Sequence, residues 1–300
     1  MSTVEIEISI NPLCEEIISD FLINELKSEG VILKETYYED EKIISETQGI
    51  IKAFFDKLPE NLEKKLQERK SFLKDAGIDE ANLGKWSIEN IIKIEDENWA
   101  HNWKKYWDVQ KIGEKTIICP SWLECTPKDN EIKIELDPGS AFGTGTHPTT
   151  RLCIKALEKY VNKNTTVADV GTGSGILAIA SKMYGASTVV GVDNDASVIQ
   201  VAKDNAEHNG ISDITFYEGS ASDINKKFDI VAANILANVI VSIMDDLTKL
   251  CLNSSKLILS GIMTDQNERV INSLKQHNFE VSEILSEENW SAIIAQPSQK

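Results

Sequence analysis

The sequence predicts an α/β protein in which a doubly wound, mostly parallel seven-stranded sheet follows a small N-terminal α+β domain. Three observations support this prediction. From Thr150 onward, apolar segments of strand length alternate with helical patterns. One of these strands runs into a glycine-rich turn and then a helix, as in nucleotide-binding sheets. The first 95 residues instead show the order βαββαβ, which is the ferredoxin-like plan.

The N-terminal domain is predicted over residues 1–95. Residues 4–10 alternate between apolar and polar side chains, which is typical of a half-buried strand. Apolar residues at helical spacing predict a helix over 12–27, and a charged helix is predicted over 59–76. The remaining strands of this domain are predicted at 31–37, 49–55 and 86–92.

Residues 96–136 are predicted to connect this domain to a larger one. Trp99, Trp103 and Trp107 have helical spacing, so a helix would place them on one stripe. They either pack against a neighbouring domain or line a substrate entrance, and packing is favoured because apolar stripes are usually buried. Two short strands are expected at 116–119 and 131–135.

The larger domain is predicted over residues 137–300. Its central strands are apolar and short, which is typical of strands that are covered by helices on both faces. They are predicted at 166–170, 187–192, 213–217, 228–233 and 256–261, with a last pair at 279–284 and 290–295.

A glycine-rich turn is the most informative motif of the chain. The strand at 167–170 runs into Gly171-Thr-Gly173-Ser-Gly175, and a helix is predicted over 176–182. Glycine allows a positive φ and lets a ligand approach the backbone where a Cβ would block it. The helix N-terminus behind the turn offers unpaired N–H donors. The turn therefore predicts a ligand site.

The acids around this turn indicate which ligand it binds. Asp193 ends the next strand, 22 residues after Gly171, where a carboxylate can accept hydrogen bonds from ribose hydroxyls. Asp169 could reach a ligand ammonium or the N–H groups of the turn, and Thr172 is expected to point away from the crowded side. The glycine spacing fits the dinucleotide fingerprint poorly. A nucleoside that carries an amino acid is therefore favoured over a pyrophosphate.

Two further segments complete the predicted site. The stretch Asp137-Pro-Gly-Ser-Ala-Phe142-Gly-Thr-Gly-Thr-His-Pro-Thr149-Thr150 predicts an ordered loop, followed by a helix that Thr149 or Thr150 could cap. Asn234 follows the strand at 228–233, at the carboxyl end where such sheets bind their ligands.

These motifs together resemble the class I methyltransferases that use S-adenosylmethionine. The long loop and Asn234-Ile-Leu resemble, more narrowly, the bacterial ribosomal protein L11 methyltransferase family, over nearly all 300 residues. The resemblance implies a sheet that ends in an antiparallel hairpin, an N-terminal domain that recognises the substrate protein, and S-adenosylmethionine as the cofactor. The cofactor-binding residues that it implies are Thr150, Gly171, Asp193 and Asn234.

The chemistry of the turn adds further candidates to this set. Gly173 would let the cofactor approach the backbone closely, and Asp169 would orient it. Ser220 could contact the adenine after the third strand of the sheet. Phe142 could stack on the adenine, although a core or hinge role would explain it equally well.

Asn234 is the predicted catalytic residue. A methyl group on a sulfonium is already activated, so transfer to an amine depends mainly on aligning nitrogen, methyl and sulfur. The side-chain carbonyl of Asn234 could accept the amine N–H groups and aim the nitrogen lone pair, whereas a carboxylate would hold the ammonium form. The alternative is that Asn234 only closes the strand as a turn residue.

The charge of the chain limits its partners. A net charge of −17 argues against direct binding of nucleic acid. It suits a basic ribosomal protein substrate, although an acidic surface could also serve only solubility. Residues 1–96 hold 12 Lys and Arg against 22 Asp and Glu.

The remaining features give expectations about location and assembly. No segment is apolar enough for a membrane span, and five scattered cysteines predict reduced thiols in the cytoplasm. The sequence contains no metal-binding motif, and nothing in it demands an oligomer, so a monomer is expected.

Three classes of function remain open at this point. The leading one is a protein N-methyltransferase that acts on lysine and N-terminal amino groups of a large-subunit ribosomal protein. The second is an oxidoreductase that holds NAD on the same fold, and the third is a binding module without catalysis. Among methyltransferases, another protein, a small molecule or a nucleic acid is the alternative substrate.

Overall fold

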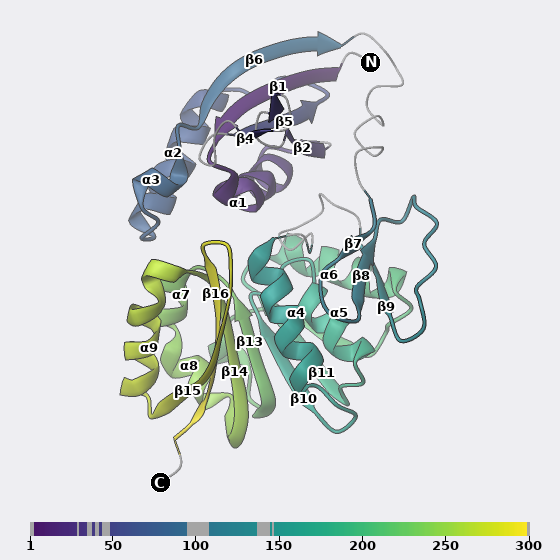
Figure 1. Cartoon of the computed structure of the whole chain (residues 1–300), viewed down its shortest axis with the longest axis vertical. Helices are drawn as coiled ribbons and strands as arrows, with labels where there is room; N and C mark the ends of the chain where they lie inside the picture. The colour runs from purple at the N-terminus through teal and green to yellow at the C-terminus, as the bar shows by residue number, and fades with distance from the viewer. Residues whose placement is uncertain are drawn as a thin grey trace. The chain divides into compact units, whose positions relative to one another are not determined.

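The computed structural model describes residues 3–28, 30–34, 38–39, 42–43, 49–94, 108–136, 145 and 147–298. The chain divides into two compact units, with the first break after Asp108, and each unit has its own sheet (Figure 1). Trp99, Trp103, Trp107 and Phe142, for which the sequence suggested roles, lie outside the described residues.

The first unit contains a four-stranded sheet in which neighbouring strands are antiparallel. In spatial order its strands are β2 (Gly30–Lys34), β5 (Gly49–Phe55), β1 (Thr3–Ile10) and β6 (Ser87–Ile94). Three α-helices and a short ribbon complete the described part: α1 (Glu15–Asp20), α2 (Leu62–Asp75), α3 (Glu80–Leu83), β3 (Tyr38–Glu39) and β4 (Lys42–Ile43). Apart from the ribbon and α3, the elements follow the order βαββαβ.

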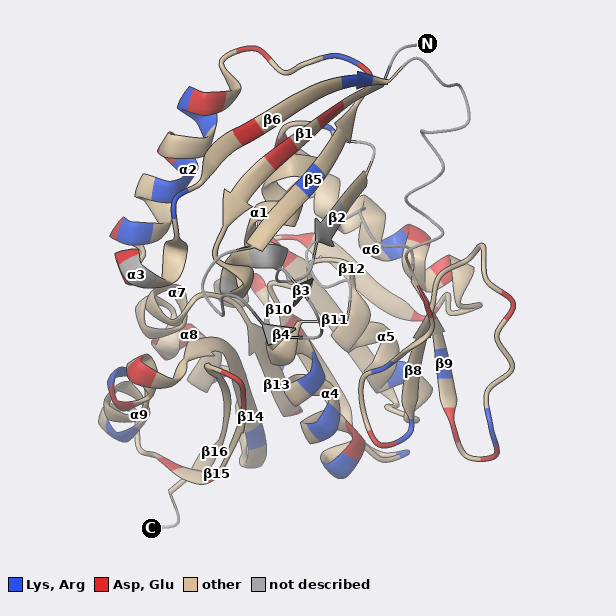
Figure 2. Ribbon diagram, turned by 45° about the horizontal axis from the view of Figure 1, so that its top comes forward, with Lys and Arg blue, Asp and Glu red and all other residues tan. Residues whose placement is uncertain are grey.

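One side of β1 carries apolar side chains and the other carries acidic ones. Ile6, Ile8 and Ile10 are buried, as the apolar side of a strand should be. On the other side, the ammonium of Lys52 on β5 lies 2.6 Å from Glu5 and 3.0 Å from Glu7. Figure 2 shows these acidic positions on β1 beside a basic position on β5. The alternating pattern of β1 therefore separates an apolar core from a charged sheet face.

The helix predicted over 12–27 is not a single α-helix. The segment starts as a 3-10 turn at Pro12–Cys14, continues as α1 and ends in a π-helical turn at Phe21–Glu25. The wider turn is visible in the hydrogen bond from the N–H of Leu26 to the carbonyl of Phe21, at 3.1 Å. Apolar spacing alone does not distinguish these helical forms, because all of them bury one side.

Residues 109–136 are not a simple connector between the units. They form a three-stranded sheet of β7 (Gln110–Lys111), β8 (Thr116–Cys119) and β9 (Ile132–Glu135), and belong to the second compact unit. Their apolar residues Ile112, Ile118 and Ile134 join the core beneath the large sheet. From Val109 onward, the segment expected as a connector at 96–136 is therefore part of the larger unit, because its apolar side chains are buried there.

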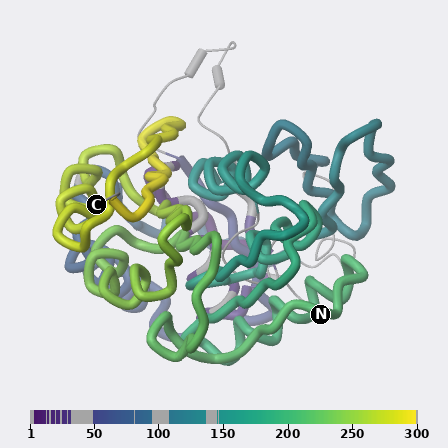
Figure 3. The backbone as a smooth tube through the Cα atoms, turned by 90° about the horizontal axis from the view of Figure 1, so that it is seen from below, coloured from purple at the N-terminus to yellow at the C-terminus, as the bar shows by residue number. Residues whose placement is uncertain are grey.

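The second unit is built on a seven-stranded sheet, and its chain can be followed from teal to yellow in Figure 3. In spatial order the strands are β12 (Ile214–Glu218), β11 (Thr188–Asp193), β10 (Thr166–Val170), β13 (Phe228–Asn234), β14 (Cys251–Met263), β16 (Trp290–Pro297) and β15 (Phe279–Glu287). The first five are parallel, and β16 and β15 are antiparallel. The predicted seven-stranded, mostly parallel sheet is confirmed.

Helices cover both faces of this sheet. One buried cluster holds residues of the first three helices of the unit, and the other holds residues of the last three. These helices are α4 (Pro148–Tyr160), α5 (Ile176–Met183) and α6 (Ala196–His208), then α7 (Ala237–Ser242), α8 (Met244–Lys249) and α9 (Asn267–Gln276). Alternate strand residues enter opposite clusters, as Val167 and Ala168 do. Such a sheet is doubly wound, as predicted.

Ion pairs connect helix α4 to the edge strand β15. Arg151 and Lys155 lie 2.6 and 2.7 Å from the carboxylate of Glu287, and Lys159 lies 2.7 Å from Glu283. These three basic residues are one helical turn apart, so they share one side of α4. No described helix is both long and apolar enough to cross a membrane.

Candidate active site

Three parallel strands bring the predicted residues to one edge of the sheet. Val170, the last residue of β10, pairs with Val192 of β11 and with Ala233 of β13. The next residues along the three strands are Gly171, Asp193 and Asn234. Because parallel strands run in the same direction, these residues stand side by side at the carboxyl edge, where doubly wound sheets bind ligands.

The turn after β10 requires glycine at its first position. Gly171 has a φ of 72°, which side chains rarely adopt. A Cβ there would also lie 2.4 Å from Cγ2 of Ile235, the residue after Asn234. Since isoleucine is branched at Cβ, this methyl group cannot easily move aside. The turn and the segment after β13 are therefore in direct contact through Gly171.

Asp169, near the end of β10, is hydrogen-bonded to the glycine turn. Its side chain is fully buried, and its Oδ2 accepts a hydrogen bond from the hydroxyl of Thr172 at 2.6 Å. Thr172 is itself buried, so the expectation that it points away from the crowded side is wrong. The hydroxyl of Thr172 points inward because the buried carboxylate of Asp169 needs a hydrogen-bond donor. The structure shows that Asp169 contacts the turn through the hydroxyl of Thr172. Its Oδ1 is buried without a partner among the described residues, and a contact with a ligand ammonium stays a prediction.

The pKa of Asp169 gives the first testable prediction. Burial is the largest cause that raises this pKa, to about 7, and the hydroxyl of Thr172 opposes the rise. Because the folded protein holds this proton more tightly than the unfolded chain, the stabilising contribution is full below about pH 4 and is lost as the pH rises to about 7. We expect the free energy of unfolding to fall by up to about 1.4 kcal/mol per pH unit in this window.

Denaturant unfolding of the wild type and of Asp169→Asn at several pH values measures this contribution. The variant has no carboxylate to titrate, so its stability should change less with pH than that of the wild type. Parallel curves for the two proteins between about pH 4 and 7 would exclude a titrating Asp169 in the folded state.

Asp193 links the turn to the second strand. Its Oδ2 accepts the N–H of Gly173 at 3.1 Å, and its Oδ1 accepts the N–H of Asp195 at 3.2 Å. Burial raises the pKa of Asp193, and these main-chain donors oppose the rise. The carboxylate is therefore fixed beside the glycine turn while each oxygen keeps a further lone pair for a ligand hydroxyl.

Of the two polar atoms in the Asn234 side chain, only Nδ2 has a hydrogen-bond partner among the described residues. Its Nδ2 donates to the hydroxyl of Thr150 at 3.4 Å, which sets the orientation of the amide. Its Oδ1 is buried and accepts no hydrogen bond from any described residue. A buried carbonyl without a donor costs about 1–3 kcal/mol, so the Oδ1 of Asn234 is available to accept a hydrogen bond from a bound molecule. Thr150, itself fully buried, here contacts Asn234.

The helix that carries Thr150 begins differently from the prediction. His147, and neither Thr149 nor Thr150, caps α4: its Nδ1 accepts the N–H of Thr149 at 3.3 Å. Pro148 occupies the first helical position, where its missing N–H is not needed. Thr150 is therefore free to turn its side chain toward Asn234 instead of the helix end.

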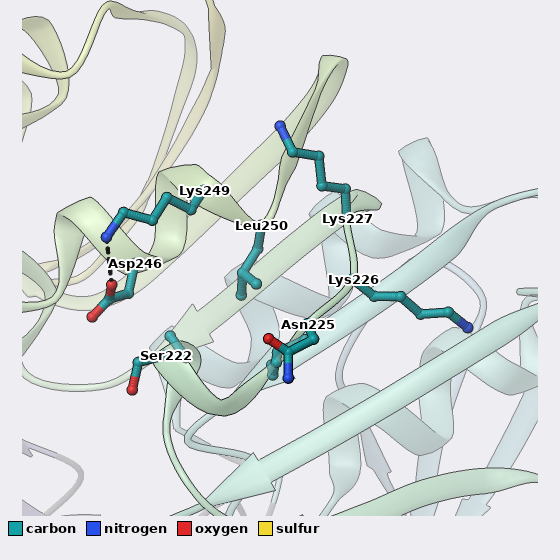
Figure 4. Close-up of a pocket in the computed structure, with 9 residues that line it drawn as sticks. Ser222, Asn225, Lys226, Lys227, Asp246, Lys249 and Leu250 are labelled. Carbon is teal, nitrogen blue, oxygen red and sulfur yellow. Dashed lines mark hydrogen bonds and ion pairs between the residues drawn. The ribbon is translucent and has the colours of Figure 1, made fainter.

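Ser220 follows β12 at the same edge of the sheet, where the N–H of Gly219 donates to the main-chain carbonyl of Asp193 at 2.8 Å; the contact of Ser220 with an adenine stays a prediction. Ser220 is exposed and caps a short turn, with its N–H and hydroxyl both donating to Asp223. Figure 4 shows a pocket just before β13, where Lys226 and Lys227 point in different directions and Lys249 lies 3.0 Å from Asp246. This pocket lies at the amino end of the strands, opposite Asn234. No three metal-ligating residues cluster in the described part of the chain.

The arrangement fits a nucleoside that carries an amino acid. Asp193 offers carboxylate lone pairs beside the turn, and Asn234 offers a buried carbonyl that lacks a donor. The fold and this set of residues define a class I methyltransferase that uses S-adenosylmethionine.

Comparisons with known proteins identify the family. Residues 2–298 match the family described as ribosomal protein L11 methyltransferase (PrmA). Proteins named ribosomal protein L11 methyltransferase are 42% identical over 251 residues in Clostridium perfringens strain SM101 and 40% identical over 275 residues in Bacillus pumilus. The first alignment covers 82% of this chain and 79% of the relative, and the second covers 90% and 87%.

A solved structure agrees with this result. The ribosomal protein L11 methylase of Lactobacillus delbrueckii subsp. bulgaricus is 33% identical, with a TM-score of 0.62. The match covers 64% of this chain and all of that chain. The chain belongs to the ribosomal protein L11 methyltransferase family, and its methyl donor is S-adenosylmethionine.

Proposed function

We propose that this enzyme transfers methyl groups from S-adenosylmethionine to lysine and N-terminal amino groups of ribosomal protein L11. The names of the relatives support this substrate. The observation that carries the chemistry is the buried Oδ1 of Asn234, which has no donor among the described residues. An amine that enters the site supplies such a donor.

Some residues of the proposed site bind the cofactor, and others orient the amine. Gly171, Gly173 and Asp193 hold the nucleoside, and Thr150 fixes the amide of Asn234. When bound, S-adenosylmethionine supplies a methyl group that its sulfonium has already activated. Asn234 accepts an amine N–H and aims the nitrogen lone pair, which is an orientation effect. Its neutral carbonyl does not favour the ammonium form.

We assign substrate recognition to the N-terminal domain, residues 1–95, and cofactor binding to the domain predicted at 137–300, to which residues 109–136 add a small sheet. The excess of acidic residues in the first 96 positions supports a basic ribosomal protein as the partner. We propose that the enzyme acts as a monomer in the cytoplasm and does not bind nucleic acid directly.

Methyl transfer from radiolabelled S-adenosylmethionine to purified L11 tests the proposal. Label should enter L11 and not an acidic control protein, and intact-mass measurement should show increments of whole methyl groups. Label in ribosomal RNA or a small molecule alone would support the alternative substrates. Binding of the cofactor without any transfer would leave a binding module, and tight NAD binding would favour an oxidoreductase.

Asp193→Asn is expected to weaken cofactor binding by roughly 10- to 100-fold. A hydrogen bond to a charged acceptor contributes about 1.5–3 kcal/mol, and the new amide group would also meet the N–H of Gly173 or Asp195. Isothermal titration with S-adenosylmethionine measures the change in Kd. Asp213→Asn is the matched control, because Asp213 pairs with Lys182 before β12, at the opposite edge. Equal Kd values for both variants would remove Asp193 from the cofactor site.

A further inference from the structure

Trp290 stands at the same edge of the sheet as Asn234. It is the first residue of β16, and it pairs with Met263, the last residue of β14. β14 is the parallel neighbour of β13, in which Asn234 pairs with Ser260. Because β16 runs antiparallel to β14, its beginning lies where the parallel strands end. Trp290 is thus two strands away from Asn234 at the carboxyl edge.

The first turn of α4 lies against both residues. The ring of His147, the cap of α4, meets the indole of Trp290 edge to face, with centroids 4.8 Å apart at 67°. Three residues later, Thr150 accepts the hydrogen bond from Asn234. The main-chain N–H of Thr150 also donates to the carbonyl of His147 at 3.0 Å. One helical turn therefore connects the indole to the proposed catalytic amide.

The indole N–H of Trp290 has no acceptor among the described residues. Trp290 is only 3% exposed, and its Nε1 donates to no described residue. Buried tryptophans normally find a partner for this group, because a buried donor without an acceptor destabilises the fold. Trp86 in the first unit shows the usual case, since its buried Nε1 donates to the carbonyl of Leu83 at 2.7 Å.

We propose that the indole N–H of Trp290 binds an oxygen that arrives with a reactant. The acceptor is either the carboxylate of S-adenosylmethionine or a main-chain carbonyl of the methylated protein. The second source rests on the proposed function, and the first rests only on the cofactor. The buried N–H of Trp290 and the buried Oδ1 of Asn234 then form a complementary pair, one donor and one acceptor, that bound reactants complete.

The indole resonances of 15N-labelled enzyme test this proposal directly. The chain has six tryptophans, and Trp290→Phe identifies the signal of Trp290 by its loss. A hydrogen bond to oxygen moves an indole proton downfield and slows its exchange with water. We expect this change at Trp290, while the signal of Trp86, which already has an acceptor, stays in place.

The order of addition identifies the source of the oxygen. A shift on adding S-adenosylmethionine alone assigns the cofactor carboxylate, and a shift only after L11 joins the cofactor-loaded enzyme assigns a substrate carbonyl. No shift at either step overturns the proposal. A shift with the cofactor combined with no methylation of L11 would reject the proposed substrate and keep the role of Trp290.

Binding by Trp290→Phe gives an independent measurement. Phenylalanine keeps an aromatic ring against His147 but removes the N–H. If the acceptor is a carboxylate, the Kd for S-adenosylmethionine should rise roughly 10- to 100-fold, because charged hydrogen bonds are the stronger ones. If it is a main-chain carbonyl, the KM for L11 should rise about 2- to 10-fold with an unchanged cofactor Kd. Wild-type values of both constants in a folded variant would also overturn the proposal.

Discussion

Asn234→Asp is expected to lower kcat about 100-fold, with a much smaller change in the Kd for S-adenosylmethionine. The amide of Asn234 is buried, and its Nδ2 is held by the hydroxyl of Thr150. A carboxylate at this position would favour the protonated, unreactive form of the amine. It would also lose the N–H that Thr150 accepts, so the acceptor oxygen would no longer be fixed. Both effects act on the amine more than on the nucleoside.

Single-turnover kinetics and titration of the cofactor separate the two constants. Asn225→Asp is the matched control: it makes the same chemical change at an exposed site before β13, and it should leave kcat as in the wild type. Thermal unfolding of both variants shows whether the buried carboxylate destabilises the fold. An unchanged kcat in Asn234→Asp would exclude Asn234 from the reaction and leave it as a residue that closes the strand.

Gly171→Ala is expected to destabilise the protein by about 2–4 kcal/mol and to weaken cofactor binding at least about 10-fold. Two separate costs add at this position. A φ of 72° is unfavourable for any residue with a Cβ, and that Cβ would lie 2.4 Å from Cγ2 of Ile235. Relief of the clash must move either the turn or the segment that follows Asn234. Either movement would disturb the proposed cofactor site.

Gly210→Ala separates these two costs. Gly210 has a φ of 70°, and a Cβ there would meet nothing within 4 Å. The control should therefore lose only about 1 kcal/mol, from the backbone conformation alone. Removing the methyl group with Ile235→Ala should restore part of the stability of Gly171→Ala, which a double-mutant cycle measures. Equal losses for Gly171→Ala and Gly210→Ala would show that the contact with Ile235 has no energetic effect.

The sequence predicted the large sheet best where strands are short and apolar. The strand predicted at 166–170 is β10 to the residue, because each of its ends is marked by a turn. The strand predicted at 256–261 is much longer, Cys251–Met263. Its first part contains the exposed Asn253 and Ser254 and the buried Ser255, and these polar residues carry no apolar signal.

The structure brings the predicted site residues to one edge of the sheet, but the sequence missed some of the residues that hold them in place. Thr172 was expected to point outward, yet it donates to Asp169. His147 was not assigned as the cap of α4, although His-Pro before a helix offered a weak signal, since proline is favoured at the first helical position. No local pattern marked Trp290, which is 143 positions after the histidine ring that it meets.

The order of strands and helices and the position of the glycine turn follow from the sequence by itself. They depend on apolar periodicity and on backbone angles, which neighbouring residues set. Only the tertiary structure decided that residues 109–136 join the larger unit, and that Thr150 orients Asn234 across 84 positions. These features depend on which distant side chains share a buried space, and local patterns do not encode that choice.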